Sequence, residues 1–197
     1  MELKLVDGKE LIGLARKSLN YFFASNAVMK DVAPKKFSEK QGVFVTLNEF
    51  PSKELRGCIG FPNPIMPLWN AVIEASVSAG FNDPRFNALK LEELEKITLE
   101  ISVLSVPKEI EGDKELIPEK IEITKDGLII KMRERTGLLL PQVAMEWEWD
   151  SKEFLEQTCV KAGLQKDAWK EKECKILKFQ AQIFSEKEPN KKVIEVH

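Results

Sequence analysis

Apolar residues recur along this chain with two spacings, one typical of helices and one typical of strands. A first helix is predicted after Gly8, ending near Ser25, because apolar residues recur there at intervals of four, four and three. These residues are Leu11, Ala15, Leu19 and Phe22. A second helix is predicted from Pro67 to Ala79, with Gly80 as its C-terminal stop.

Strand-like segments flank these helices. Residues 42–47 and 54–61 are rich in Val, Phe and Ile, and the short connection between them predicts an antiparallel hairpin. Apolar residues alternate again from Ile97 to Val103 and from Leu177 to Ile183, and predict two further strands. A short acidic helix is expected over residues 91–96.

The second half of the chain carries turn and capping signals. Asp126-Gly127 predicts the turn of a hairpin between residues 121–123 and 128–132, because this dipeptide supplies the positive φ angles that such a turn needs. Ser151 is the expected N-cap of a helix that stops near Gly163. Helices and hairpins in this order predict an α+β fold, with an antiparallel sheet flanked by helices. The charged stretch 108–120, marked by Pro107 and Pro118, is the best candidate for a lobe boundary or an insertion.

Composition narrows the class of protein. Hydrophobic residues make up 43% and charged residues 31% of the 197 residues, the balance of a soluble globular protein. The net charge of −2 makes nucleic acid an unlikely partner, and no apolar run reaches the length of a membrane span. Three cysteines without C-x-x-C spacing are typical of reduced thiols, so we expect a cytoplasmic protein.

The inventory of residues excludes many familiar catalysts. The single histidine, His197, ends the chain and is expected to fray, which leaves no imidazole for a Ser-His-Asp triad or a histidine zinc site. Neither the G-x-G-x-x-G fingerprint nor the phosphate-binding P-loop occurs. A mixed site of Cys58, Asp83 and Glu100 would mismatch soft and hard ligands, so we expect no metal and no cofactor.

The densest chemical signal is the segment Leu55-Arg56-Gly57-Cys58-Ile59-Gly60. On a strand, Arg56 and Cys58 would share one face, and a guanidinium near a thiol favours the thiolate. Gly57 and Gly60 would leave room for a ligand or another backbone. Cys58 is then a candidate nucleophile. The structural alternative is a small core cysteine, with Arg56 paired to a carboxylate.

Further candidates follow in the next segments. In Asn82-Asp83-Pro84-Arg85-Phe86, an Asx turn would hold Asp83 rigid and present Arg85 to an anion, or the two would form a surface ion pair. Glu100 lies on the face of its strand opposite the apolar residues, as a candidate base or as a solvated residue. Loop arginines near Gly137 could clamp an anion, although loop arginines are usually only solvated. The three tryptophans at 147, 149 and 169 are expected to be core anchors.

Together these segments resemble the AMMECR-type domain, the family named for the candidate protein of the AMME contiguous-gene syndrome. The hexapeptide from Leu55 to Gly60 is similar to the family signature without a change, and 83–86 looks like its D-P-R-F segment. Residues 100–105, 137–143 and 161–164 with Trp169 resemble later family segments, so the resemblance covers nearly the whole chain. One departure is Asn87-Ala88, where the family often has prolines.

The resemblance implies one domain over 1–197 with two unequal, intimately packed lobes and the hexapeptide at or near the cleft between them. We expect the larger lobe to comprise residues 1–110 with the strand 174–186, and the smaller lobe about 111–173. The family supplies no established reaction, but its prokaryotic members are associated with Memo-like and radical S-adenosylmethionine proteins.

Two functions remain open from the sequence. The first is an enzyme or substrate-handling subunit that acts on a small anionic molecule in the cleft. Cys58, Asp83 and Glu100 would be catalytic; Arg56, Gly57, Gly60 and Arg85 would bind the substrate. The second is a non-catalytic adaptor for a Memo-like or radical S-adenosylmethionine partner, which requires an exposed patch.

Overall fold

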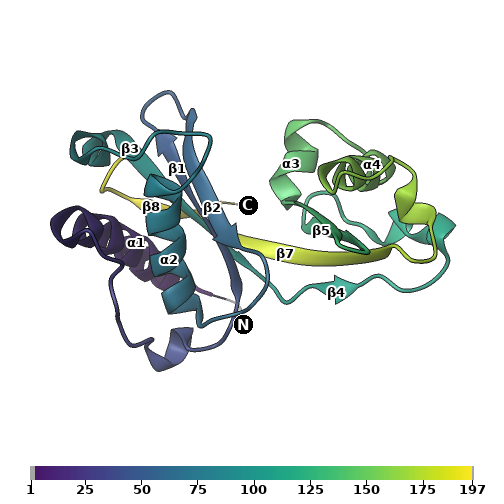
Figure 1. Ribbon diagram of the computed structural model, residues 1–197, viewed down its shortest axis with the longest axis horizontal. Helices are drawn as coiled ribbons and strands as arrows, with labels where there is room; N and C mark the ends of the chain where they lie inside the picture. The colour runs from purple at the N-terminus through teal and green to yellow at the C-terminus, as the bar shows by residue number, and fades with distance from the viewer. Residues whose placement is uncertain (1–2, 197) are drawn as a thin grey trace. The chain divides into compact units, whose positions relative to one another are not determined.

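The computed structural model describes residues 3–196, so His197 lies outside the described residues. The chain divides into two compact units. Unit 1 is Met1–Leu104 with Gln182–His197, and unit 2 is Ser105–Ala181. Strand β7, Lys175–Glu186, contributes its first residues to unit 2 and its last residues to unit 1. Antiparallel strands and helices make up both units (Figure 1), which confirms the predicted α+β class.

Unit 1 is a sheet with two long helices packed against it. Its strands are β1 (Gly42–Glu49), β2 (Leu55–Phe61), β3 (Ile97–Leu104), β8 (Val193–Val196) and the end of β7. The helices are α1 (Leu5–Ser25) and α2 (Leu68–Phe81), with short 3-10 turns η1 (Lys35–Phe37) and η2 (Leu91–Lys96). β1 lies between β2 and β3 and is antiparallel to both, so the predicted hairpin is confirmed and β2 forms the edge of the sheet.

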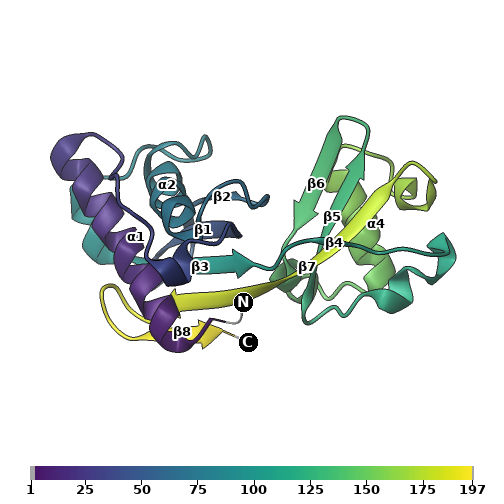
Figure 2. The same cartoon turned by 90° about the horizontal axis from the view of Figure 1, so that it is seen from below.

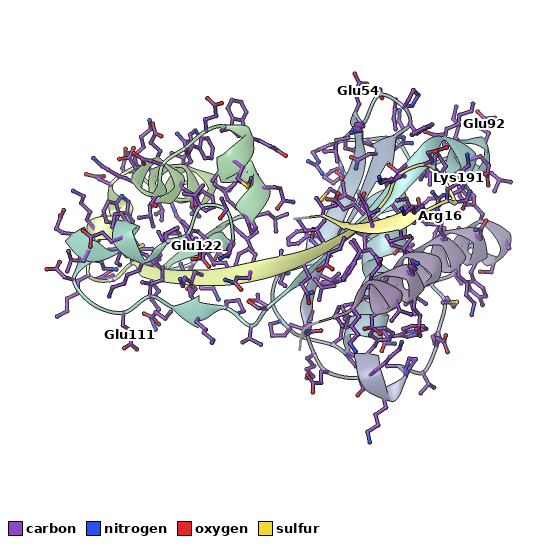
Figure 3. All side chains as sticks on the ribbon, turned by 180° about the vertical axis from the view of Figure 1, so that it is seen from behind. Arg16, Glu54, Glu92, Glu111, Glu122 and Lys191 are labelled. Atoms are coloured by element: carbon purple, nitrogen blue, oxygen red, sulfur yellow. The ribbon has the colours of Figure 1, made fainter. Side chains whose placement is uncertain are left out.

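The apolar face of this sheet meets the helices. Val43, Val45 and Leu47 of β1 are fully buried in one cluster with side chains of α1 and α2. α2 packs on β1 and β2, while α1 packs on β3, β8 and α2 (Figures 1 and 2). A buried ion pair ties α1 to the sheet: the guanidinium of Arg16, labelled in Figure 3, donates to Glu186, whose carboxylate also accepts from the Leu99 amide.

Unit 2 has its own core. Its strands are β4 (Lys108–Glu109), β5 (Asp126–Met132), β6 (Arg135–Leu139) and the start of β7; the β5–β6 hairpin is clearest in Figure 2. Its helices are α3 (Pro141–Glu146) and α4 (Ser151–Lys161), with 3-10 turns η3 (Lys114–Leu116), η4 (Pro118–Lys120) and η5 (Ala168–Lys170). Phe154 and Leu155 of α4 and Trp169 of η5 are buried together against β5.

Three predicted boundaries in the helices are wrong. Helix α1 starts before Gly8. A side chain at this position would overlap the Phe184 ring, so the glycine provides space within the helix and does not mark its start. Helix α2 continues through Gly80 to Phe81 and ends at Asn82, since Gly80 packs beside Leu19 and Leu89 instead of terminating the helix. The N-cap of α4 is Asp150, not Ser151; its carboxylate accepts from the Glu153 amide. The stop at Gly163, with φ of 70°, is confirmed.

The predicted Asp126-Gly127 turn is also wrong. Both residues belong to β5, and the hairpin turn lies between Met132 and Arg135, with Arg133 at φ 54°. Asp126 is buried, where its carboxylate accepts from Lys178 and from the Glu122 amide. Gly127 faces the Phe179 ring of β7, which leaves no room for a side chain. Tertiary packing therefore overrides the local turn preference of this dipeptide.

Candidate functional site

The edge strand β2 presents the backbone of Cys58 to the segment that follows α2. The Cys58 amide donates to Asp83 Oδ2 at 2.9 Å, and Arg85 Nη2 donates to the Cys58 carbonyl oxygen at 3.1 Å. Asp83 and Arg85 thus take the place of a neighbouring strand at this point, and we refer to them as the edge clamp. An edge strand otherwise leaves such groups unpaired, so the edge clamp fixes the backbone of Cys58.

The edge clamp is itself held rigidly. Arg85 Nε donates to Asp83 Oδ1 at 2.9 Å and Nη2 donates to Oδ2 at 2.7 Å, while the Arg85 amide closes the predicted Asx turn onto Oδ1 at 3.1 Å. Asp83 is only 4% exposed, whereas the Arg85 side chain is 53% exposed. The pair therefore joins a buried carboxylate to a half-exposed guanidinium, so only its Arg85 side lies at the surface, where the sequence left open a surface ion pair.

The protonation state of Asp83 follows from this geometry. The Arg85 guanidinium, and to a smaller extent the Cys58 and Arg85 amides, hold the pKa of Asp83 well below its usual range, although burial opposes them. The pKa of Arg85 is raised, chiefly by Asp83, with a smaller contribution from Cys58. Asp83 is therefore an ionised hydrogen-bond acceptor throughout the neutral range.

The Cys58 side chain is half-buried and meets a hydroxyl. Thr46 Oγ1, on β1, donates to Cys58 Sγ at 3.3 Å. The register pairs Thr46 with Cys58 on one side and with Glu100 of β3 on the other, so the three residues form a row across three strands. Cys58 and Glu100 are two strand spacings apart, about 10 Å, with Thr46 between them. Residues Thr98 and Ser102 of β3 share this face and are buried.

Arg56 pairs with a carboxylate of η2. Its Nε and Nη2 bind both carboxylate oxygens of Glu93, in η2, at 2.7 and 3.1 Å, and Nη1 is buried without a partner among residues 3–196. This is the carboxylate pairing that the sequence left open as an alternative. The pKa of Glu93 is lowered, mainly by its hydrogen bonds with Arg56. A register shift between Leu47 and Asn48 interrupts the regular alternation next to Arg56.

The two glycines of the hexapeptide have packing roles. A side chain at Gly57 would overlap the carbonyl oxygen of Ala79, so Gly57 allows α2 to lie close against β2. A side chain at Gly60 would overlap the Val43 carbonyl and the Phe44 ring. Space at both positions is thus filled by the protein itself.

The structure brings together part of the predicted site and adds residues that the sequence did not single out. Cys58, Asp83 and Arg85 are in direct contact, and Arg56 binds Glu93. Glu100 is the register partner of Thr46, which contacts Cys58. The sequence does carry a signal for Thr46, which is the polar side chain in the predicted apolar strand 42–47. Glu93 carried no local signal, because it is 37 residues from Arg56 in the sequence.

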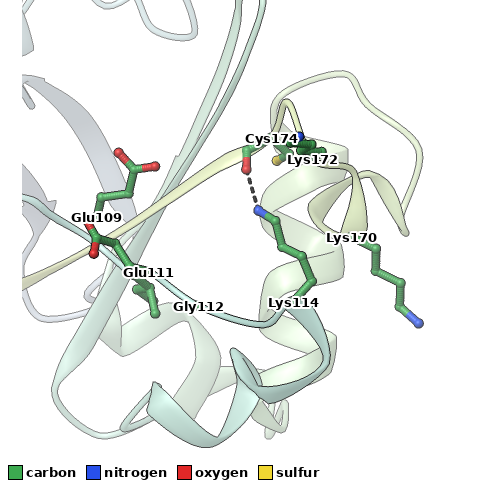
Figure 4. A pocket seen from close by; sticks show the side chains of 8 residues that line it. Glu109, Glu111, Gly112, Lys114, Lys170, Lys172 and Cys174 are labelled. Carbon is green, nitrogen blue, oxygen red and sulfur yellow. Dashed lines mark hydrogen bonds between the residues drawn. The ribbon is translucent and has the colours of Figure 1, made fainter.

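A separate cavity of about 380 Å³ lies in unit 2 (Figure 4). Its lining includes Glu109, Glu111, Lys114, Lys172 and Cys174, and Lys114 Nζ donates across it to the Cys174 carbonyl oxygen at 2.5 Å. Burial raises the pKa of the Cys174 thiol. The cavity contains none of the predicted site residues and offers a protonated, buried thiol.

Residues 3–196 contain neither a cluster of metal-ligand side chains nor a membrane-spanning helix. No three His, Cys, Asp or Glu side chains in this range are grouped so that they could hold a metal ion. None of the helices formed by these residues combines the length and the apolar character needed to cross a bilayer.

Comparison with known proteins identifies the family. Residues 12–184, which include every candidate site residue, match the AMMECR1 family. The chain belongs to the AMMECR1 family. This confirms the resemblance expected from the hexapeptide and the segments that follow it.

Relatives in the AMMECR1 family match over nearly their whole length. The chain is 48% identical to a protein of Aquifex aeolicus over 93% of this chain and 95% of the relative. It is 47% identical to a protein of Methanopyrus kandleri, over 95% and 92%. The crystal structure of an uncharacterized Pyrococcus horikoshii protein superimposes with a TM-score of 0.90 at 44% identity, covering 96% of each chain. The names of these three relatives assign no activity.

Proposed function

We propose that the chain binds a small anionic molecule beside Cys58 and acts on it as an enzyme or a substrate-handling subunit. The proposal rests on one observation: the edge clamp fixes both backbone polar groups of Cys58, and this residue stays only half-buried. A thiol that serves only to fill a core needs no such fixation. Reactive cysteines are partly accessible and lie near cations, as Cys58 lies near Arg85.

Arg85 is the group we assign to the anion. Its Nε and Nη2 are occupied by Asp83 and Cys58, but about half of the side chain is exposed. Its Nη1 has no hydrogen-bond partner within the described residues. A guanidinium whose one edge is fixed by a carboxylate can present the remaining donor to an incoming anion in a defined orientation.

The other residues take supporting roles in this proposal. Cys58 is the reacting group, as a nucleophile or a proton donor. In the proposed reaction the Thr46 hydroxyl turns so that it accepts the proton of the Cys58 thiol and passes its own proton to Glu100, its register partner on β3, which serves as the base. Asp83 positions Arg85 and Cys58, because its low pKa keeps it ionised. Arg56 acts through Glu93, which it anchors beside the start of β2.

The test compares two alkylating reagents of similar size that differ in charge. Iodoacetate is an anion and iodoacetamide is neutral, so the ratio of their rates at Cys58, divided by the same ratio for free N-acetylcysteine, measures anion binding. We expect this normalised ratio to exceed about five and to fall with added phosphate, since an ion pair at a partly exposed site contributes about 1 kcal/mol.

Variants assign the effect to Arg85. Arg85→Gln should bring the normalised ratio close to one, whereas Arg133→Gln should leave it unchanged; Arg133 is an exposed arginine of unit 2 that pairs with Glu173. A ratio of one in the unaltered protein, or a high ratio that survives Arg85→Gln, would contradict the proposed anion site.

A further inference from the structure

Unit 2 exposes a pair of stacked indole rings at the end of α3. Trp147 is 66% exposed and the neighbouring Met145 is 49% exposed. The rings of Trp147 and Trp149 are stacked, with centroids 5.9 Å apart and planes 17° from parallel, and Trp149 packs on the core of unit 2. The expectation that the tryptophans are core anchors holds for Trp169 and is wrong for Trp147. Trp149 therefore contacts both the exposed ring of Trp147 and the core of unit 2.

The backbone between the two indoles has an unusual residue. The Trp149 amide donates to the Ala144 carbonyl at 2.9 Å, which closes α3 as a Schellman motif and puts Glu148 in the left-handed position with φ 54°. Glycine is usual at this position, and glutamate is disfavoured there. The glutamate adds a carboxylate beside the rings at a position where stability alone would favour glycine.

The charged residues next to these tryptophans in the sequence are all acidic. Residues 145–150 contain Glu146, Glu148 and Asp150 and no basic residue. Glu146, Trp147 and Glu148 are all exposed. Within the described part of the chain, the side chains of Glu146 and Glu148 form no ion pair or hydrogen bond. Electron-rich ring faces and carboxylates attract the same kind of group, a cation with an apolar stem.

We propose that Trp147, with Glu146 and Glu148 beside it, is a docking surface for a basic segment of a partner protein. An arginine or lysine of that segment lies over the exposed face of Trp147, its charge meets the two carboxylates, and its methylene stem contacts Met145. The residues of this surface belong to unit 2, whereas those around Cys58 belong to unit 1.

The test titrates the full-length protein with a short peptide of alternating arginine and glycine, followed by fluorescence anisotropy of a label on the peptide. A peptide of alternating glutamate and glycine is the control. We expect the arginine peptide alone to bind, and Trp147→Ala to weaken it about three- to fivefold, the loss that corresponds to one exposed cation–π contact. Added salt should weaken binding to the unaltered protein.

Paired variants separate the surface from general electrostatics. Glu146→Gln with Glu148→Gln should weaken binding several-fold, whereas Glu119→Gln with Glu134→Gln, the same change of net charge at two exposed sites elsewhere in unit 2, should leave it unchanged. Glu148→Gly is the sharpest variant. It should raise the denaturant midpoint, because glycine suits the left-handed position, and yet weaken binding.

Three outcomes would overturn the proposal. These are no binding of the arginine peptide, equal weakening by both double variants, and binding that is unaffected by both Trp147→Ala and Glu148→Gly. Sedimentation of the unaltered protein without peptide provides a further check. Self-association that Trp147→Ala abolishes, without peptide binding, would assign the surface to a second copy of this chain instead.

Discussion

The thiols of unit 1 and unit 2 have opposite surroundings. Cys58 is half-buried on the edge strand β2, with its backbone bound by Asp83 and Arg85 and its sulfur beside the Thr46 hydroxyl. Cys159 and Cys174 are buried in the core of unit 2. Burial raises the pKa of Cys159 to about 12 and also raises that of Cys174, so both remain thiols at neutral pH.

This difference separates a positioned thiol from two packing thiols. Core cysteines behave as small apolar side chains, and their neighbours need only fill space. Around Cys58, in contrast, a buried carboxylate and a guanidinium form directed bonds with the backbone. Directed bonds to both polar groups of one edge residue indicate that its position is defined, which is what the proposed reaction at this thiol requires.

Removing the edge clamp should have the largest effect on the free energy of unfolding. Asp83→Ala leaves the Cys58 amide unpaired and takes away the partner of Arg85, so we expect the free energy of unfolding to fall by about 2–4 kcal/mol. Glu173→Ala breaks an exposed ion pair with Arg133 and should cost less than about 0.5 kcal/mol. Urea unfolding of both variants measures the difference, and a similar small loss in the two would mean that the edge clamp does little.

Gly57→Ala should have the next largest effect on the free energy of unfolding. A methyl group there overlaps the Ala79 carbonyl, so α2 must move away from β2 at a cost of about 1–3 kcal/mol. The control is Gly13→Ala in α1, where a methyl group meets no atom within 4 Å and should stabilise the helix by about 0.5–1 kcal/mol. If Gly57 only packs, the preference of Cys58 for iodoacetate in Gly57→Ala should be retained.

Acid should destabilise the protein less than these substitutions do, because a protonated Asp83 still fills the same space. The pKa of Asp83 is lower in the folded chain than the unperturbed 3.8, so its stabilising contribution is present above about pH 4 and is lost as the pH falls below that value. Urea unfolding of the unaltered protein and Asp83→Asn between pH 7 and pH 3 isolates this contribution. The difference in unfolding free energy should be constant down to about pH 5 and narrow below pH 4; a difference that widens in acid would contradict the assignment.

Thr46→Val should have the smallest effect on stability. Valine keeps the shape of threonine and removes one hydrogen bond to sulfur, so we expect a loss of about 1 kcal/mol or less. The alkylation rate of Cys58 should nevertheless change several-fold, because the hydroxyl contacts the reacting atom. Thr136→Val is the control on the exposed part of β6, and its Cys58 should react at the unaltered rate.

Local patterns predicted the elements that position Cys58. Strand alternation placed Cys58 on the second strand of an antiparallel hairpin, and the Asx turn placed Arg85 beside Asp83. These features depend on neighbours within a few residues, which the sequence displays directly. The same holds for the left-handed stop at Gly163.

Contacts between distant segments could not be predicted. Asp83 reaches the Cys58 amide across 25 residues, and Arg56 reaches Glu93 across 37. No local spacing encodes these distances, since they depend on how α2 and η2 pack along the sheet edge. Tertiary packing also overrode local preference at Gly80, which packs closely beside Leu19 within α2, and at Asp126-Gly127, where the Phe179 ring leaves no room for a side chain on Gly127.

The most direct test of the central claim is the alkylation rate of each cysteine in the native protein, measured with iodoacetamide and resolved by peptide mass spectrometry. Cys159 and Cys174 serve as internal controls. The two environments predict that Cys58 is modified in the folded protein while Cys159 and Cys174 react only after unfolding. If Cys58 also remains unmodified until the protein unfolds, it is a packing residue like the other two, and the proposed reaction at this site is wrong.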